Sequence, residues 1–431
     1  MALQQAEKNQ FGTQIAQELS ETLYACSSLT LLSGGTANFL FRGVLAQPLQ
    51  DGTKTIIIKH SKEFVSANRH FQLDVSRCVG NLFLFSSMCF NEVSADGNIL
   101  TFDDIYVYQL FEVIMLNALD SFPSTAVDKF YLRTPHLYLF DQKTNTQVLE
   151  DLSGMIDMKA ALESPTAPSI LTQSISTDIG RSLGAWLRSF HSWASEPAQA
   201  GLQREMGENK PMRKIRYSIS YGAFIDVVQK FPEIWEGCKK ALEEVRDMAT
   251  AEYAKNIEDK VGENWGIIHG DFWSGNSIKL SILIPNTPSP ERQQLEGTNL
   301  FVIDWELAQF GRKEYDLGQM IGDLYERKHF RDANSAVWII QGFVTGYGAL
   351  SDEMAFRIAI HAGVHLICWY IRRDPTAPFT KPLKQIQDAI RIGTDFIVKG
   401  WEKDRTWFEG TFLENPYAAA HYLALAERLI N

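Results

Sequence analysis

One stretch of the chain, residues 268–306, constrains the fold most, because it combines a polar motif of fixed spacing with an apolar run that ends in an acid. It opens with Ile-His-Gly-Asp-Phe-Trp-Ser-Gly-Asn, which places His269, Asp271 and Asn276 in the pattern HxDxxxxN. It closes with Phe-Val-Ile-Asp-Trp-Glu, in which Asp304 follows the apolar run. A single Asp or Asn is usually a turn former or a cap, but this ordered pair of motifs is hard to reach by chance.

The spacing is that of a kinase catalytic loop followed by a metal-binding strand. Phosphoryl transfer from ATP needs a carboxylate that orients the acceptor hydroxyl and ligands that hold the metal ions at the phosphates. Asp271 would supply the carboxylate and accept the proton, and Asn276 and Asp304 would hold the metal. His269 would brace the loop by hydrogen bonding. A protein kinase fits less well, because Asp304 is followed by Trp-Glu instead of Phe-Gly and no Ala-Pro-Glu sequence follows.

At these residues the sequence resembles the aminoglycoside phosphotransferase and choline kinase superfamily, most closely its methylthioribose-kinase-like branch and, within that branch, the fungal 4-hydroxytryptamine kinases. The resemblance extends, with gaps, from about Leu31 to about Trp369. It implies an α+β, bilobal, protein-kinase-like fold, with an antiparallel sheet in a small N-terminal lobe and a larger, mainly helical C-terminal lobe. It also implies a phosphotransferase that uses ATP and Mg²⁺ and moves the γ-phosphate to a hydroxyl group of a small molecule.

Composition agrees with a two-lobed chain and excludes some partners. The 431 residues exceed the size at which a single core stops growing. The net charge of -11 argues against nucleic-acid and anionic-membrane partners, which need a basic footprint. No apolar run reaches the length of a membrane span, the N-terminus lacks a secretory pattern, and the scattered cysteines have no metal spacing. These features predict a cytoplasmic protein and leave its oligomeric state open.

Residues 1–152 are predicted to form the N-terminal, nucleotide-binding lobe. Within them, 31–44 reads as two strand-like pieces separated by small residues. A glycine-containing hairpin lets backbone amides approach a polyphosphate closely, although an ordinary hairpin turn would look the same. The resemblance assigns five residues of this turn to the phosphates of ATP: Ser33, Gly34, Gly35, Thr36 and Asn38.

The next apolar strand, over 55–60, resembles the strand that carries the ATP-binding lysine of the family. Lys59 would then bridge the α- and β-phosphates; a lysine at the end of an edge strand is the alternative. A kinase fold pairs this lysine with a glutamate from the following helix. The resemblance assigns that role to Glu112, in a helix predicted over 111–119.

Residues 79–110 interrupt the family pattern. The helix that carries Glu112 is expected to begin over 70–78 and to resume at 111. We hypothesise that 79–110 is an insertion, and a retained intron translated in frame would explain it, because the pattern resumes without loss. The intron explanation fails if every mature transcript encodes 79–110 and the product is active.

Two strands around a polar turn are predicted over 134–141 and 146–152. The second resembles the hinge between the lobes, where the backbone of Glu150, Asp151 and Leu152 would read the adenine edge. The lobe boundary is therefore expected near residue 153.

Residues 153–431 are predicted to form the C-terminal catalytic and substrate-binding lobe. A long helix is expected from Ile175 onward, and 196–211 is expected to be a loop because it contains two prolines and two glycines. Helical segments follow over 212–230 and 232–258, a region that helps to form the acceptor pocket in the family.

Several polar residues near the catalytic stretch have less certain roles by sequence. Glu306 resembles the second acid of an Asp-x-Glu motif and would contact the metal, with an ordinary surface glutamate as an equal alternative. Asp316 is expected to cap a helix and to fix the catalytic loop. His361 and His365 lie four residues apart, and we predict core packing for them because no acidic third ligand is evident nearby. Trp369 or Tyr370 would line the acceptor pocket by analogy.

A catalytically silent, nucleotide-binding scaffold is the alternative from a different functional class, and the interruption at 79–110 keeps it open. A silent protein would usually have lost one of three residues, Lys59, Asp271 or Asp304, and all are present. The acceptor molecule cannot be identified from these patterns.

Overall fold

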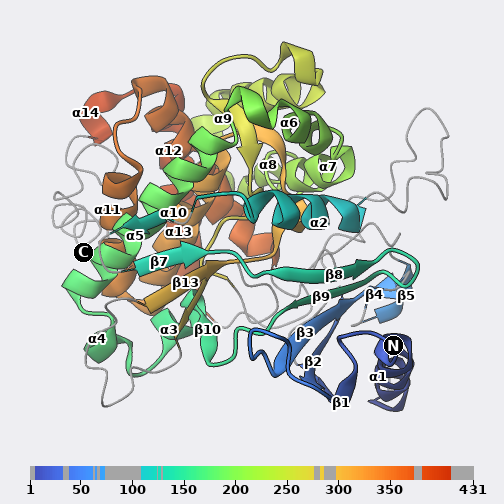
Figure 1. Ribbon diagram of the computed structural model, residues 1–431. Coiled ribbons are helices and arrows are strands. Elements are labelled where there is room, and N and C mark those ends of the chain that lie inside the picture. Colours follow the sequence, from blue (N-terminus) through green and yellow to red (C-terminus); the bar gives the residue numbers. More distant parts are fainter. Residues whose placement is uncertain are drawn as a thin grey trace.

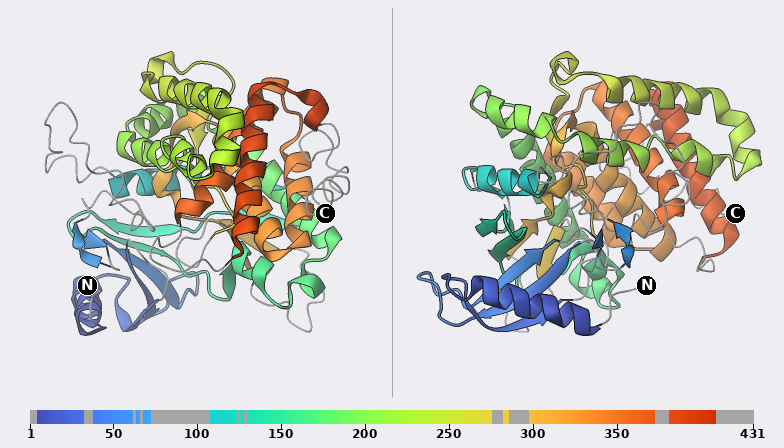
Figure 2. Two further views of the ribbon diagram at one scale, coloured as in Figure 1. Left: turned by 180° about the vertical axis from the view of Figure 1, so that it is seen from behind. Right: turned by 90° about the vertical axis from the view of Figure 1, so that its right-hand side faces the viewer.

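The computed structural model describes residues 5–32, 38–61, 64–65, 68–72, 108–123, 125–127, 130–275, 282–285, 298–372 and 381–408. In Figure 1, one end of the molecule carries a sheet and the first helix, and the other end is built mainly of helices. The two further views in Figure 2 show the same separation. The fold is therefore α+β, as predicted.

The sheet at the N-terminal end has five antiparallel strands in the order β1-β2-β3-β9-β8. Their bounds are β1 (Cys26–Leu31), β2 (Phe39–Leu45), β3 (Thr55–His60), β8 (Leu137–Asp141) and β9 (Thr146–Glu150). Alternate residues of β2 are buried, because successive side chains of a strand point to opposite faces. Helix α1 (Gln5–Leu19) covers the buried face and packs Ile15 and Leu19 against Phe39 and Phe41. This arrangement confirms the predicted strands over 31–44, 55–60 and the hinge region.

The segment after β3 corrects one expectation. Residues 70–72 belong to a strand, β5 (Asn68–Gln72), which pairs with β4 (Phe64–Val65), although 70–78 was predicted to start a helix. Pairing with a neighbouring strand outweighs the weak local preference of such a short segment. Residues 73–107, which include most of the expected insertion, lie outside the described part of the chain. The helix that carries Glu112, α2 (Tyr108–Leu119), begins three residues before the expected start at 111 and so includes the last three residues of the expected insertion.

A second five-stranded sheet has the order β10-β12-β13-β7-β6. Its strands are β6 (Thr125–Val127), β7 (Phe130–Arg133), β10 (Met155–Asp157), β12 (Ile282–Pro285) and β13 (Thr298–Val302), and β13 pairs with β7 in parallel. A separate antiparallel pair joins β11 (Trp265–Ile268) to β14 (Gln309–Arg312). The motifs singled out by sequence thus follow β11 and β13. The lobe boundary near residue 153 stays a prediction, because the second sheet takes strands from both sides of it.

Helices make up most of the remaining described chain. Their bounds are α3 (Met158–Glu163), α4 (Ala167–Ile170), α5 (Gln173–Trp193), η3 (Pro197–Gln199), α6 (Ala200–Gly207), α7 (Lys210–Ser218), α8 (Phe224–Val228), α9 (Pro232–Ala254), η4 (Ile257–Asp259), η5 (Trp305–Leu307), α10 (Glu314–Arg331), α11 (Asn334–Tyr347), α12 (Asp352–Cys368), η6 (Trp369–Arg372), α13 (Leu383–Trp401) and α14 (Arg405–Phe408). The long helix from 175 is confirmed as α5. The predicted loop over 196–211 is wrong: Pro197 opens η3, where its missing N–H costs nothing, and Gly201 lies in an exposed turn of α6.

Helices α5 and α11 pack unusually closely because glycines face each other across their contact. A β-carbon added at Gly184 would lie 2.0 Å from the carbonyl oxygen of Phe343, and one added at Gly342 would lie 2.0 Å from that of Thr177. Only the absence of a side chain permits this approach. Helix α5 lies deep in the protein, since its residues Trp186, Leu187 and Phe190 are buried in the largest core cluster.

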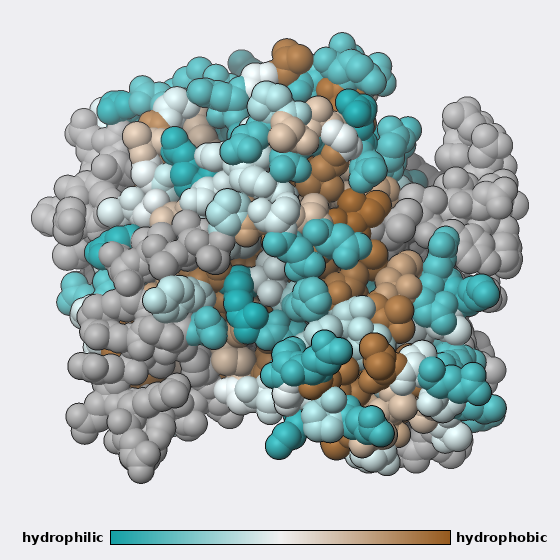
Figure 3. Space-filling model, in the orientation of Figure 1, coloured by the Kyte–Doolittle hydropathy of each residue, from teal (hydrophilic) through white to brown (hydrophobic). Residues whose placement is uncertain are grey.

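The outer surface of the described residues is mixed. Figure 3 shows hydrophilic and neutral residues over most of one face, with apolar residues gathered near its centre and lower edge. Among the described residues, no helix combines the length and the apolar character that crossing a membrane would require.

Candidate active site

Lys59 lies at the centre of the candidate site. Its Nζ donates to Glu112 Oε2 at 2.7 Å and lies 3.4 Å from Asp304 Oδ1 and 3.5 Å from Glu306 Oε2. Gln147 on the neighbouring strand also donates to Glu112, at 3.1 Å. The structure therefore brings together residues from β3, α2 and the turn after β13, which are far apart in sequence.

The local structure explains why these side chains converge. Strand β3 lies between β2 and β9, so Lys59 is on an inner strand, and the edge-strand alternative is wrong. Asp304 has a left-handed backbone conformation (φ 68°, ψ 61°), which ends the extended run of β13 and starts η5. Asp tolerates this conformation better than bulky residues do. Glu306 is only 5% exposed, so it is not the surface glutamate of the alternative interpretation.

The catalytic-loop motif lies directly beside Asp304. His269 donates from Nε2 to the carbonyl of Ile303 at 3.0 Å, and its ring lies 4.5 Å from that of Trp305. Its Nδ1 accepts from the backbone amide of Asp271 at 3.3 Å, which fixes the tautomer. His269 thus contacts both sequence neighbours of Asp304 and braces the loop, as predicted. The loop that carries Asp271 and the turn that carries Asp304 therefore share one region.

A buried carboxylate holds the start of this loop. Asp316 accepts from the backbone amides of His269 at 2.8 Å and Gly270 at 3.0 Å, and from His191 Nε2 at 3.2 Å. Burial alone would raise the pKa of Asp316, but the hydrogen bond and charge of His191 and the charges of nearby cations leave the pKa below its ordinary value. Asp316 therefore fixes the loop. It does not cap a helix, because Lys313 stands at the N-cap position of α10 and no side chain caps that end.

The neutral form of His191 completes this arrangement. Burial lowers the pKa of His191, so its ring is neutral near pH 7. Nε2–H then donates to Asp316, and Nδ1 accepts from the hydroxyl of Tyr347 at 3.0 Å. His191 is a fully satisfied core histidine that supports the loop from behind.

Two residues missed by sequence reasoning position Asp271. Gln319 Nε2 donates to Asp271 Oδ1 at 2.6 Å. The amide is oriented by Arg216, whose Nη1 donates to Gln319 Oε1 at 2.9 Å and also to the carbonyl of Gly270. Arg216 Nη2 in turn donates to His361 Nε2 at 3.0 Å. The sequence signal for Gln319 was its spacing of three and four residues from Asp316 and Asp323, and Arg216 lies in a helix rich in basic residues.

A second network holds the later part of the loop. Asp323 accepts from the backbone amide of Ser274 at 3.1 Å and from its hydroxyl, and Arg327 binds Asp323 at 3.1 Å and Glu163 at 2.7 Å. These contacts tie the loop to α10 and α3. The motif Phe-Trp-Ser-Gly is therefore fixed by charge-assisted hydrogen bonds on its Ser274 side.

The predicted core role of the two histidines on α12 holds for His361. Burial and the charge of Arg216 hold the pKa of His361 well below its ordinary value, so the ring accepts from Arg216. His365 is buried as well, as predicted. Acids do lie near it, however: Asp323, Glu326 and His365 place one possible metal-ligand atom each within 4.8 Å of one another. Arg327 already binds both acids, so this cluster is an ion-pair network here.

Other predicted site residues fall in three groups. One group lies outside the described residues and consists of Ser33, Gly34, Gly35, Thr36 and Asn276. Asn38 is buried beside β3, where it accepts from the hydroxyl of Ser61. At the expected hinge, Glu150 is bound by Arg133 at 2.6 Å and Asp151 by Arg42 at 2.9 Å, and Leu152 follows directly. The hinge side chains are thus engaged in ion pairs, which leaves recognition there to the backbone.

The two aromatic residues suggested for the acceptor pocket pack against neighbours. Trp369 stacks on Phe330 with ring centroids 4.2 Å apart, and Tyr370 makes an edge contact with Phe231 at 5.7 Å. Both remain partly exposed. Their role in acceptor binding stays a prediction.

No protein-family model matches the sequence. The chain is 32% identical, over 94% of its length and 96% of the relative, to the phosphotransferase FrzJ of Cladobotryum sp. It is 23% identical to the 4-hydroxytryptamine kinase of Psilocybe cubensis, over 80% of each chain.

Solved structures with a similar course of the chain include a choline/ethanolamine kinase family protein from Mesorhizobium loti. That structure has a TM-score of 0.44 and 12% identity, and the match covers 91% of this chain and 99% of the other. The ADP-bound aminoglycoside phosphotransferase APH(2'')-Ib has a TM-score of 0.43 and 10% identity, over 92% and 100% of the two chains.

Proposed function

The chain belongs to the family of the phosphotransferase FrzJ, and from this premise we propose that it is a kinase of the aminoglycoside phosphotransferase and choline kinase superfamily that transfers the γ-phosphate of ATP to a hydroxyl group of a small molecule. The observation that carries the proposal is the position of Lys59, whose Nζ contacts Glu112 and Asp304 at once. A phosphate-binding lysine fixed by a helix glutamate beside a metal-binding acid is the arrangement that phosphoryl transfer requires.

Asp271 is proposed to orient the acceptor hydroxyl and to receive its proton. Its Oδ1 is held by Gln319, so the carboxylate has a defined direction before the acceptor arrives. Proximity and orientation of this kind supply a large part of the rate enhancement, because phosphoryl transfer needs little covalent help from the protein.

The donor set suits Mg²⁺, which prefers carboxylate oxygens. Asp304 Oδ1 and Glu306 Oε2 both lie within 3.5 Å of Lys59 Nζ, so the two acids face one point. Asp304 and Glu306 would hold the ion, with Asn276 as a further proposed ligand. Bound there, Mg²⁺ would neutralise charge on the phosphates.

We also propose which residues bind the phosphates and the adenine ring of ATP. Lys59 would bind the α- and β-phosphates, and residues 33–38 would cover them. The backbone of Glu150, Asp151 and Leu152 would read the adenine ring. The proposal places 1–152 on the nucleotide side and 153–431 on the acceptor side, and the reaction in the cytoplasm, where ATP is supplied.

The acceptor is proposed only as a small molecule with a free hydroxyl group. One relative is a 4-hydroxytryptamine kinase, but we do not assign that substrate to this chain. The silent-scaffold alternative predicts nucleotide binding without transfer. Titration with Mg-ATP, beside a transfer assay, separates the two functions.

The proposal is tested with γ-labelled ATP and a metabolite extract, followed by mass identification of the labelled product. Asp271→Ala should reduce transfer by about 10²-fold or more, because it removes the proton acceptor, and should keep Mg-ATP binding. Asp247→Ala is the matched control, since that side chain is 69% exposed. Transfer by Asp271→Ala at the wild-type rate would refute the assignment of the base.

A further inference from the structure

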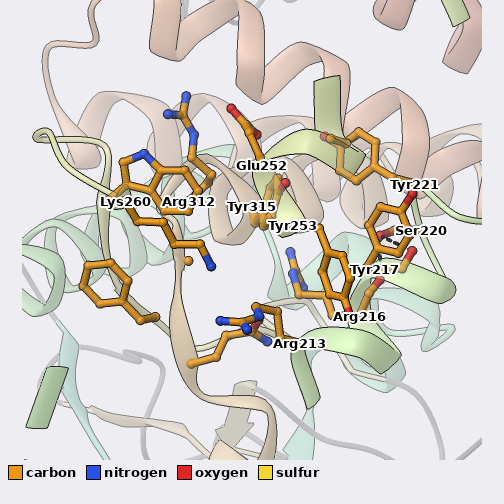
Figure 4. Close-up of a pocket in the computed structure, with 15 residues that line it drawn as sticks. Arg213, Arg216, Tyr217, Ser220, Tyr221, Glu252, Tyr253, Lys260, Arg312 and Tyr315 are labelled. Carbon is orange, nitrogen blue, oxygen red and sulfur yellow. Dashed lines mark hydrogen bonds between the residues drawn. The ribbon is translucent and has the colours of Figure 1, made fainter. Parts of the chain in front are cut away.

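A second pocket lies behind the catalytic loop, between α7, the end of α9, β14 and the segment that leads into β11. Its lining includes Arg213, Arg216, Lys260 and Arg312, together with Tyr253 and Trp265. Figure 4 shows the charged ends of Lys260, Arg213 and Arg216 directed toward a common space. Lys59, Asp271 and Asp304 do not line this pocket, so it is distinct from the proposed transfer site.

The cations of this pocket are not all neutralised. Arg312 binds Glu314 at 2.8 Å, and the pocket's acid, Glu252, binds Arg357 at 3.1 Å. Within the described part of the chain, Lys260 and Arg213 make no ion pair. The pocket therefore keeps positive charge in a protein whose net charge is -11.

Lys260 is the most informative of these residues, because it is only 4% exposed. Its Nζ lies 5.5 Å from the ring centroid of Trp265, and no described side chain accepts a hydrogen bond from it. Burial, and then the charge of Arg213, lower the pKa of Lys260 to about 8. A buried ammonium that forms no ion pair is costly, and a bound anion would reduce that cost.

The two arginines add directional donors. Arg213 Nε and Arg216 Nε are both buried, and neither has a hydrogen-bond partner among the described residues. The other nitrogens of Arg216 are engaged by the catalytic loop, Gln319 and His361, so its guanidinium is held in place. Arginine N–H groups and a lysine ammonium are the donors that bind oxyanions most strongly in proteins.

We propose that this pocket binds the oxyanion group, phosphate or carboxylate, of a small organic molecule, between Lys260 and Arg213 and against the aromatic wall. Tyr253 and Tyr217 form that wall, since their rings stack 4.7 Å apart beside Arg213. The ligand would be recognised by its charge at one end and by aromatic contact along its body. This inference does not rest on the proposed function, because Lys260 and Arg213 take no part in the proposed transfer site. Arg216 lines the pocket and also contacts the catalytic loop.

The test is a calorimetric titration of the full chain at constant ionic strength, with inorganic phosphate, phenyl phosphate and benzoate as probes and chloride as the background ion. We expect saturable one-to-one binding of at least one oxyanion. Stronger binding of phenyl phosphate than of inorganic phosphate would support the organic ligand. Benzoate binding as tight as that of phenyl phosphate would assign the site to carboxylates.

Lys260→Met and Arg213→Met should each weaken binding about tenfold or more, because each removes a charge-assisted contact. Lys240→Met on α9 is the matched control, since it removes the same charge from a side chain that is 91% exposed. Thermal melting of each variant verifies that it is folded. Lys59→Met separates the two sites, and anion binding should persist in this variant. If binding were lost in Lys59→Met and kept in Lys260→Met, the anion would bind at the transfer site, and the proposal would be overturned. Absence of saturable binding by all three probes would also overturn it.

Discussion

Gln319 fixes the direction of the Asp271 carboxylate from outside the motif that contains it. Arg216 donates to Gln319 Oε1, so the amide can present only Nε2 to Asp271. The hydrogen bond occupies one oxygen of the carboxylate. Gln319 is thus a positioning residue for the proposed proton acceptor.

Replacement of Gln319 by Leu should lower kcat by about tenfold or more and leave KM for ATP nearly unchanged, because the nucleotide contacts are untouched. ADP release measured with an identified acceptor, over a range of ATP concentrations, gives both constants.

Gln229→Leu is the control, since Gln229 is exposed. A Gln319→Leu enzyme whose KM for ATP rises as kcat falls would contradict the positioning role and leave only a structural one.

One helix, α10, holds the catalytic loop in place along its length. Asp316, Gln319 and Asp323 recur at spacings of three and four residues, so they lie on one face of the helix. In order, they contact the amides of His269 and Gly270, the carboxylate of Asp271, and Ser274. The loop therefore runs along the helix with its residues in register. Polar residues at this spacing in a buried helix are the signal by which sequence reasoning could have found Gln319.

Asp316→Asn should lower the free energy of unfolding by about 2 kcal/mol near pH 7, because the charge-assisted bonds to two amides and His191 become neutral ones. The pKa of Asp316 is lower in the folded protein than its ordinary value of 3.8. Its contribution is therefore present above that value and lost as the pH falls through the folded pKa.

Urea unfolding of the wild type and Asp316→Asn between pH 7 and pH 3 measures this difference. The gap between the two proteins should narrow below about pH 4. A gap that stays constant, or widens, toward acid would show that the carboxylate charge does not stabilise the loop.

The contact between α5 and α11 gives a prediction with an internal control. Gly184→Ala should destabilise the protein by about 1–3 kcal/mol, since the added methyl group meets the carbonyl of Phe343. Gly237 in α9 has open space around it, so Gly237→Ala should stabilise the protein by about 0.5–1 kcal/mol through helix propensity alone. Chemical denaturation of both variants provides the comparison. Equal effects would mean that the helices can move apart at no cost.

At the scale of the whole molecule, the sequence predicted those site residues and strands that short local motifs mark. Lys59, Asp271 and Asp304 could be identified because each closes a recognisable strand or loop, and the N-terminal sheet followed from apolar runs. Arg216 could not be identified, because it contacts Gly270 from 54 residues away and its residue type is ordinary. The helix predicted over 70–78 is wrong for residues 70–72, because strand pairing depends on a neighbouring strand that the local sequence does not identify.

The proposed nucleotide would contact two parts of the chain that are far apart in sequence, since Lys59 belongs to the N-terminal sheet and Asp304 to the turn after β13. A ligand that binds only the folded protein stabilises it by mass action, by about 2.7 kcal/mol at a hundred times its Kd. Mg-ATP should therefore raise the midpoint of thermal unfolding, and removal of Mg²⁺ with EDTA should abolish most of that rise, because the ion links the phosphates to Asp304. Asp304→Asn should make the shift insensitive to Mg²⁺, whereas Asp247→Asn, at an exposed position, should not. If ATP with EDTA stabilised the wild type as much as Mg-ATP does, Asp304 would have no part in holding a metal, and the proposed site would need a different ligand set.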